Sequence, residues 1–236
     1  MSAKILQNKP AWLAQPGFRL GALLATLLLV GLFTALGPAE RTLGTNIRIV
    51  YLHGAWVWTG KLAFGLAALA GLAGLLRPVS RFHLPEWSLA LGRTGLLFWL
   101  TYLPLSLLVM LVNWGGFFFD EPRWKVSLMF GVVGLLLQAA LYLLNSPRLT
   151  MLANLLFGAA LWLMIGETPT EMHPVSPIFG SDAFLIQVYF VGLLALVVLL
   201  AAQVAILFHK WHLPTISPPP QPAPSPLKGA PRRGRE

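Results

Sequence analysis

A chain of 236 residues that is 56% hydrophobic and only 11% charged, with a mean hydropathy of +0.71, is too apolar to be a water-soluble domain and indicates an integral membrane protein. It contains no cysteine, which excludes disulfides, thiol redox chemistry and covalent cofactor attachment through cysteine. The formal charge of +9 does not indicate a nucleic-acid partner, because the basic residues are spread over membrane-flanking loops and a tail.

Six apolar runs predict the fold class, an all-α membrane protein built as a bundle of six transmembrane helices, because about 20 helical residues span a bilayer core. The first run is longer than the core of a cleaved secretory signal, so we expect it to be retained. The predicted regions are an N-terminus (1–17), a transmembrane domain (18–208) and a disordered, proline-rich basic tail (209–236). The predicted spans are 18–36, 49–76, 88–112, 125–144, 149–165 and 183–208.

The distribution of basic residues predicts the orientation of these spans. When the loops are assigned alternately to the two sides, eleven Lys and Arg residues fall on the side of both termini and four on the opposite side. By the positive-inside rule, both termini are cytoplasmic. The outer side then carries six of the eight acidic residues, and the basic tail is suited to contact anionic membrane lipid.

The second span carries His53, Trp58 and Lys61 on its outer half. An ionisable group inside a span is a candidate functional residue, although a histidine at a helix end is more often a hydrogen-bonded interface residue. Lys61 can reach the interface, neutralise a buried acid or bind an anionic ligand, and these alternatives stay open. Small residues farther along this span predict a close-packed helix surface. They are Gly65, Ala68, Gly71 and Gly74.

The densest aromatic and charged cluster lies between the third and fourth spans, at residues 113–125. Its sequence is Asn-Trp-Gly-Gly-Phe-Phe-Phe-Asp-Glu-Pro-Arg-Trp-Lys. Aromatic rings gather at every membrane–water interface, which is one interpretation of this loop. The adjacent glycines and three consecutive phenylalanines favour another, because an exposed apolar patch of this kind usually has a partner. The loop is therefore a candidate site for a flat ligand at the interface.

The fourth and fifth spans are joined by the short segment 145–148, which predicts that they are antiparallel neighbours. Gln138 and Asn154 lie in the middle of these two spans. We expect both to form hydrogen bonds between helices, the usual role of a polar amide inside a membrane bundle.

The outer loop 166–182 contains no Lys or Arg and places His173 beside Met172 and a proline. His53 and His173 are the two histidines on the outer side. With the aromatic loop on the same side, they are the elements of a porphyrin site with two imidazole ligands. Met172 is the alternative second ligand, because a His/Met pair also holds haem iron. Zinc is less suited, because a closed zinc site needs four ligands.

These residues resemble the haem-handling membrane proteins of cytochrome c maturation, most closely the heme exporter protein C family. The family's first motif, Arg-Ile-x-Tyr-Ile-His-Val-Pro-Ala-Ala-Trp, is matched by Tyr51, His53 and Trp58, with Ala55 at the proline position. Its second motif is Trp-Gly-x-Trp-Trp-x-Trp-Asp-x-Arg. The aligned residues are Trp114, Gly115, Phe117, Phe118, Glu121 and Arg123, with Asp120 in place of the last Trp.

The resemblance implies a haem-binding subunit of c-type cytochrome biogenesis in a bacterial-type inner membrane. In such a protein the aromatic loop and two axial histidines, His53 and His173, hold non-covalent b-type haem transiently at the outer face. Partners would be a haem chaperone and the subunits of an ABC transporter complex. No bond in the haem need be made, so the protein is not expected to be an enzyme. The alternatives are a transporter or permease subunit without haem, and a haem protein in quinone-linked electron transfer.

Overall fold

The computed structural model describes residues 16–76, 83–172, 178–180 and 183–210. Within these ranges the chain forms six helices, each long and apolar enough to cross a membrane, which confirms the predicted fold class. Each helix coincides with one predicted span to within four residues at either end, and α6 continues two residues past the predicted end of the last one. The helices are α1 (Pro16–Ala35), α2 (Ile47–Leu76), α3 (Leu84–Trp114), α4 (Pro122–Leu144), α5 (Pro147–Glu167) and α6 (Phe184–Lys210).

Local chemistry explains where several of these helices begin and end. Helices α4 and α5 start with a proline, whose fixed φ suits the first helical turn and whose missing N–H is not needed there. Between them, Asn145 adopts a left-handed conformation at φ 42° and Ser146 caps the N-terminus of α5 through the N–H of Leu149. This tight connection makes α4 and α5 antiparallel neighbours, as predicted.

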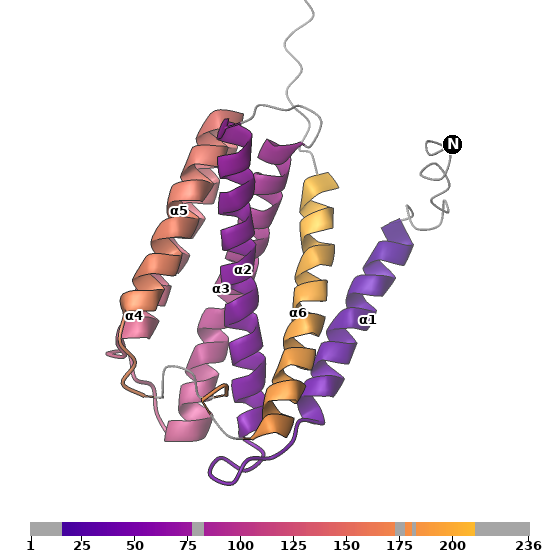
Figure 1. Cartoon of the computed structure of the whole chain (residues 1–236), viewed down its shortest axis with the longest axis vertical. Coiled ribbons are helices and arrows are strands. Elements are labelled where there is room, and N and C mark those ends of the chain that lie inside the picture. The colour runs from indigo at the N-terminus through magenta and orange to yellow at the C-terminus, as the bar shows by residue number, and fades with distance from the viewer. Residues whose placement is uncertain (1–15, 77–82, 173–177, 181–182, 211–236) are drawn as a thin grey trace, which may run out of the picture.

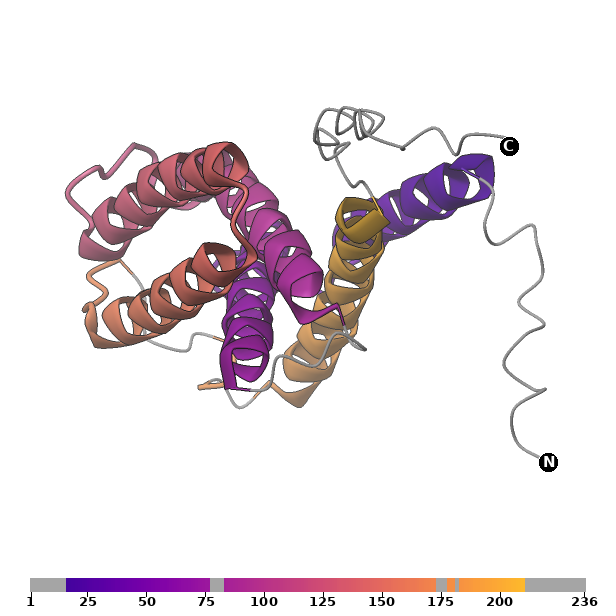
Figure 2. The same ribbon diagram turned by 90° about the horizontal axis from the view of Figure 1, so that it is seen from above.

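Helices α2 and α3 form the centre of the bundle. They pack most extensively on each other, and α2 also packs on α5 and α6. Seen from above, α4 and α5 lie on one side of this pair, and α6 and α1 lie on the other (Figure 2). Helix α1 packs mainly on α6 and is the least buried span.

Small residues allow α2 and α5 to approach closely, as predicted for this surface of α2. A Cβ added to Gly71 would lie 2.5 Å from the backbone oxygen of Met151. From the other helix, a Cβ on Gly158 would lie 2.7 Å from the backbone oxygen of Phe64. Both distances are too short for a side chain, so the glycines permit backbone contact between the two helices.

A network of polar side chains also joins α3, α4 and α5, in the half of the bundle that is predicted to face the cytoplasm. The amide of Gln138 donates to the side-chain oxygen of Asn154 at 3.2 Å, and Asn154 donates to the backbone and hydroxyl oxygens of Ser88 at 2.9 and 3.1 Å. Asn154 is 3% exposed. The predicted interhelical hydrogen bonds of Gln138 and Asn154 are therefore confirmed.

The described parts of the three loops that are predicted to be outside lie at the same end of the bundle. The α1–α2 and α3–α4 connections, and the ends of α5 and α6 that flank the last connection, are at the bottom of Figure 1. The start of α1 and the end of α6 are at the opposite end. Successive connections therefore lie at alternate ends of the bundle, as the predicted orientation requires. The cytoplasmic location of the termini stays a prediction.

That orientation predicts which positions an impermeant reagent can reach. The chain has no cysteine, so a single Thr45→Cys change in the α1–α2 loop introduces one exposed thiol. We expect this thiol to react with a membrane-impermeant maleimide in intact cells, whereas Ser80→Cys in the α2–α3 connection should react only after permeabilisation. The reverse pattern would place both termini outside.

Candidate functional site

The aromatic loop begins where α3 ends. Gly115 lies just past Trp114 in the left-handed conformation, with φ 72°, and its N–H donates to the carbonyl oxygen of Leu111 at 3.1 Å. Glycine adopts this conformation without steric cost, so it closes the helix and redirects the chain. Glu121 then precedes α4, whose first residue is Pro122. The glycine predicted to bend the backbone therefore does so.

Three consecutive phenylalanines project from this loop. Phe117 and Phe119 are 52% and 53% exposed, and Phe118 is 38% exposed. The rings of Phe117 and Phe119 lie 5.9 Å apart at an interplanar angle of 28°, and Phe119 also contacts Trp124 at 5.2 Å. The loop thus has a surface of exposed aromatic rings.

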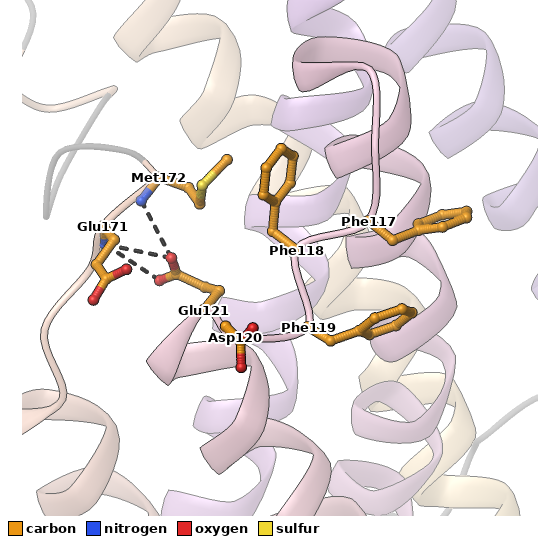
Figure 3. A pocket seen from close by; sticks show the side chains of 7 residues that line it. All are labelled: Phe117, Phe118, Phe119, Asp120, Glu121, Glu171 and Met172. Atoms are coloured by element: carbon orange, nitrogen blue, oxygen red, sulfur yellow. Dashed lines mark hydrogen bonds between the residues drawn. The ribbon is translucent and has the colours of Figure 1, made fainter.

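The carboxylate of Glu121 connects the aromatic loop to the segment that follows α5. Glu121 is 7% exposed and accepts backbone N–H groups from Glu171 at 3.4 Å and Met172 at 3.2 Å (Figure 3). Hydrogen bonds to a carboxylate are stronger than bonds between neutral groups. A residue predicted to bind the ligand is therefore also a link between two loops.

Arg123 supplies a second link between the same segments. Its Nε donates to the carbonyl oxygen of Thr168, the C-cap of α5, at 2.9 Å. The guanidinium thus extends from the first turn of α4 to the end of α5. With Glu121, it positions the segment preceding His173 beside the aromatic loop.

A half-open hollow of about 230 Å³ lies between the two loops. The ring of Phe118 and the side chain of Met172 face each other across it, while Phe117 and Phe119 point away (Figure 3). Its volume is below the roughly 300–1,000 Å³ of pockets that enclose a small molecule. It can therefore hold an edge of a larger ligand. The lining residues are Phe117, Phe118, Phe119, Asp120, Glu121, Glu171 and Met172.

The charge at this hollow is mainly negative. The ammonium of Lys125 lies 2.7 Å from a carboxylate oxygen of Asp120 and, by hydrogen bonding and by its charge, lowers the pKa of that carboxyl. Asp120 therefore stays ionised to a lower pH than an isolated aspartate. Three of the acidic residues expected on the outer side, Asp120, Glu121 and Glu171, line the hollow beside the exposed rings.

His53 lies deeper in the bundle than the hollow. Its ring is partly buried and lies 5.2 Å from the ring of Tyr102, whose hydroxyl donates to the hydroxyl oxygen of Ser127 at 3.1 Å. Ser127 is six residues along α4 from Glu121, a rise of about 9 Å. His53 is therefore on the predicted side of the bundle, about two helical turns beneath the loops.

Trp58 is not part of this hollow. Its ring is 40% exposed and lies 6.1 Å from that of Trp162 on α5. Trp114 and Gly115 do not line the hollow either, since both belong to the end of α3. Of the predicted ligand-binding residues, the structure places Phe117, Phe118 and Glu121 in the wall, with Arg123 supporting it.

His173 lies outside the described residues, so its predicted ligation stays a prediction. Met172, the alternative ligand, is described and lines the hollow. Sequence reasoning did not identify Glu171 as a neighbour of the aromatic loop. Its position two residues before His173 was the only available signal, because the contact depends on pairing between segments 50 residues apart.

Comparisons of the chain with protein-family models, with curated proteins and with solved structures found no match.

Proposed function

We propose that this protein binds haem at the outer face of a bacterial-type inner membrane and holds it for delivery to a haem chaperone. The observation that carries the proposal is the pair of links made by Glu121 and Arg123. They bring Phe118 opposite Met172, which is the alternative second ligand and the residue before His173. Aromatic residues and a proposed ligand residue, distant in sequence, thus line one hollow.

The residues present fit a porphyrin held at its edge. The hollow is smaller than a pocket that encloses a drug-sized molecule, so a porphyrin extends beyond it. Phe118 and Met172 offer apolar contact on its two sides, and exposed rings continue the surface. An open site of this kind suits a ligand that is received and released, and a haem held here is bound non-covalently.

His53 is the proposed ligand from the helix bundle. Neutral imidazole is a common ligand of haem iron, and the second ligand comes from the outer loop, as His173 or Met172. His53 lies about two turns beneath Glu121, so a haem that it holds would extend from the helix bundle toward the loops. The aromatic loop then contacts the part of the ring that a receiving protein must reach.

The proposed partners follow from the sequence resemblance to heme exporter protein C. They are a haem chaperone, the subunits of an ABC transporter complex and the surrounding membrane lipid. Transfer of intact haem makes and breaks no covalent bond in it, so the protein is proposed to act as a binding subunit and not as an enzyme.

The test is an absorption spectrum of the detergent-purified protein during titration with haemin. We expect a low-spin Soret band that saturates at one haem per chain. A Phe117→Ala, Phe118→Ala double variant, which removes two rings of the lining, should bind at least tenfold more weakly, because each lost aromatic contact costs on the order of 1 kcal/mol. Leu144→Ala at the opposite end of α4 is the matched control and should bind as the parent does. If the double variant binds haemin as tightly as the parent does, the loop is only an anchor at the membrane interface.

A second candidate function is a transporter or permease subunit, and the position of Lys61 favours it. Lys61 lies within a membrane span. Charged groups within spans mark many substrate pathways. Transport by reconstituted protein that carries no pigment would favour this function. An electron-transfer role with quinone has less support, because a single pair of axial ligands does not form a chain across the membrane.

A further inference from the structure

Lys61 lies between two tryptophans within the membrane-spanning part of the bundle. Its Nζ is 4.7 Å from the ring centroid of Trp58 and 4.3 Å from that of Trp162. Both distances are in the range of cation–π attraction, which becomes stronger where water is excluded. The two rings therefore hold the ammonium at a defined place between α2 and α5.

The ring of Trp162 is itself held in place. The indole Nε1 of Trp162 donates to the backbone oxygen of Lys61 at 3.0 Å. A Cβ added to Gly65 would come within 3.0 Å of the same Nε1, so the glycine leaves room for the ring. The position of Trp162 thus depends on its hydrogen bond and on the absence of a side chain one turn farther along α2.

No carboxylate among the described residues pairs with Lys61. Four of the six described acidic residues have other partners, and the remaining two, Glu167 and Glu171, are exposed near the outer loop. The four with partners are Glu40, Glu86, Asp120 and Glu121. Among the described residues, Lys61 therefore does not neutralise a buried acid, which was one of the three roles considered for it.

The ammonium lies between exposed surfaces of α2 and α5, below the boundary at which α5 ends. Trp58 and Trp162 are 40% and 36% exposed, and Leu62, Leu66 and Leu69 on the same helix are also exposed, as expected of a lipid-facing surface. Helix α5 ends at Glu167, five residues or about 7.5 Å beyond Trp162. Side chains lean toward the N-terminus of their helix, so Lys61 of α2 extends toward this boundary.

Because no carboxylate among the described residues pairs with Lys61, an anionic group from outside the chain can neutralise its ammonium. The oxygen atoms of that group would accept hydrogen bonds from the ammonium, while attached acyl chains would lie along the exposed leucines.

We propose that Lys61, flanked by Trp58 and Trp162, binds the phosphate of an anionic phospholipid from the outer leaflet. A phospholipid matches the three features together: a negative headgroup for the ammonium, glycerol at the level of the tryptophans, and acyl chains for the leucine surface. The site is separate from the hollow at the aromatic loop, and the proposal does not depend on haem binding.

Native mass spectrometry of the detergent-purified protein tests this site directly, with phosphatidylglycerol and phosphatidylcholine as the two probes. The parent protein should retain phosphatidylglycerol in preference to phosphatidylcholine. In the Lys61→Gln variant, the affinity for phosphatidylglycerol should fall about fivefold while that for phosphatidylcholine stays the same. Lys61→Arg, which keeps the charge, should restore the preference. The matched control is Lys125→Gln, which removes an exposed ammonium near the outer face that is paired with Asp120.

A second measurement needs no variant. In vesicles of phosphatidylcholine with 20% brominated phosphatidylglycerol, tryptophan fluorescence of the parent protein should be quenched more strongly than with the same fraction of brominated phosphatidylcholine. Equal quenching by the two lipids would overturn the proposal. So would unchanged phosphatidylglycerol affinity in Lys61→Gln. A loss of haemin affinity alone in that variant would also overturn it, because the ammonium would then serve the carboxylates of haem and not a lipid.

Discussion

Replacement of His53 with Ala is expected to abolish stable haem retention by the purified protein. The variant loses the one proposed ligand that a helix holds in a fixed position. Loss of a residue that only supports a metal ligand already costs roughly 10- to 100-fold in affinity, so loss of the ligand itself should cost at least as much. In haemin titrations, the six-coordinate low-spin spectrum should become five-coordinate or disappear.

The control for this variant is a histidine at the other end of the bundle. His83 precedes α3 in the left-handed conformation, with φ 47°, so Asn is a better replacement there than Ala. His83→Asn should leave the haem spectrum unchanged. If His53→Ala instead keeps the parent spectrum and affinity, His53 is an interface residue packed against Tyr102, and the proposed ligation is wrong.

The second axial ligand is distinguished by two further variants in the outer loop. If His173→Ala changes the spectrum and Met172→Ala does not, the pair is His53 and His173. The opposite result assigns the pair to His53 and Met172, which lines the hollow. If neither change has an effect, the outer loop supplies no ligand and the site is restricted to the helix bundle.

Substitution of Gly158 by Ala is expected to destabilise the whole bundle. The added methyl group would lie 2.7 Å from the backbone oxygen of Phe64 and 2.8 Å from the Cβ of Ala68, so α5 must move away from α2. Overpacking of a well-packed interface costs about 1–3 kcal/mol, and Leu at this position should cost more. Thermal unfolding in detergent, followed by circular dichroism, should show a lower Tm for Ala and little folded protein for Leu.

Gly166 is the matched control on the same helix. A Cβ at this position would meet no atom within 4 Å, and alanine is the better helix former by up to about 1 kcal/mol. Gly166→Ala should therefore leave the Tm unchanged or raise it slightly. Equal losses of stability in the two variants would show that helix propensity, and not contact with α2, governs the effect at Gly158.

The number and position of the helices could be predicted from the sequence because they depend on local properties. Each span is a continuous apolar run of sufficient length, and in lipid the backbone must satisfy its own hydrogen bonds, so such a run forms a helix. The turn between α4 and α5 and the bend at Gly115 were predictable for the same reason, since short-range residue chemistry decides them. Small residues likewise marked the surface of α2 that packs closely.

Only the tertiary structure decided which of the candidate residues share a site. His53 and Trp58 are five residues apart, but at about 100° per residue they point to directions about 140° apart, so His53 meets Tyr102 on α3 and Trp58 meets Trp162 on α5. Glu121 shows the same dependence, because the backbone groups that its carboxylate accepts belong to residues 50 and 51 positions away. Such pairings arise from the relative rotation and depth of whole helices, and no pattern within a single span carries that information.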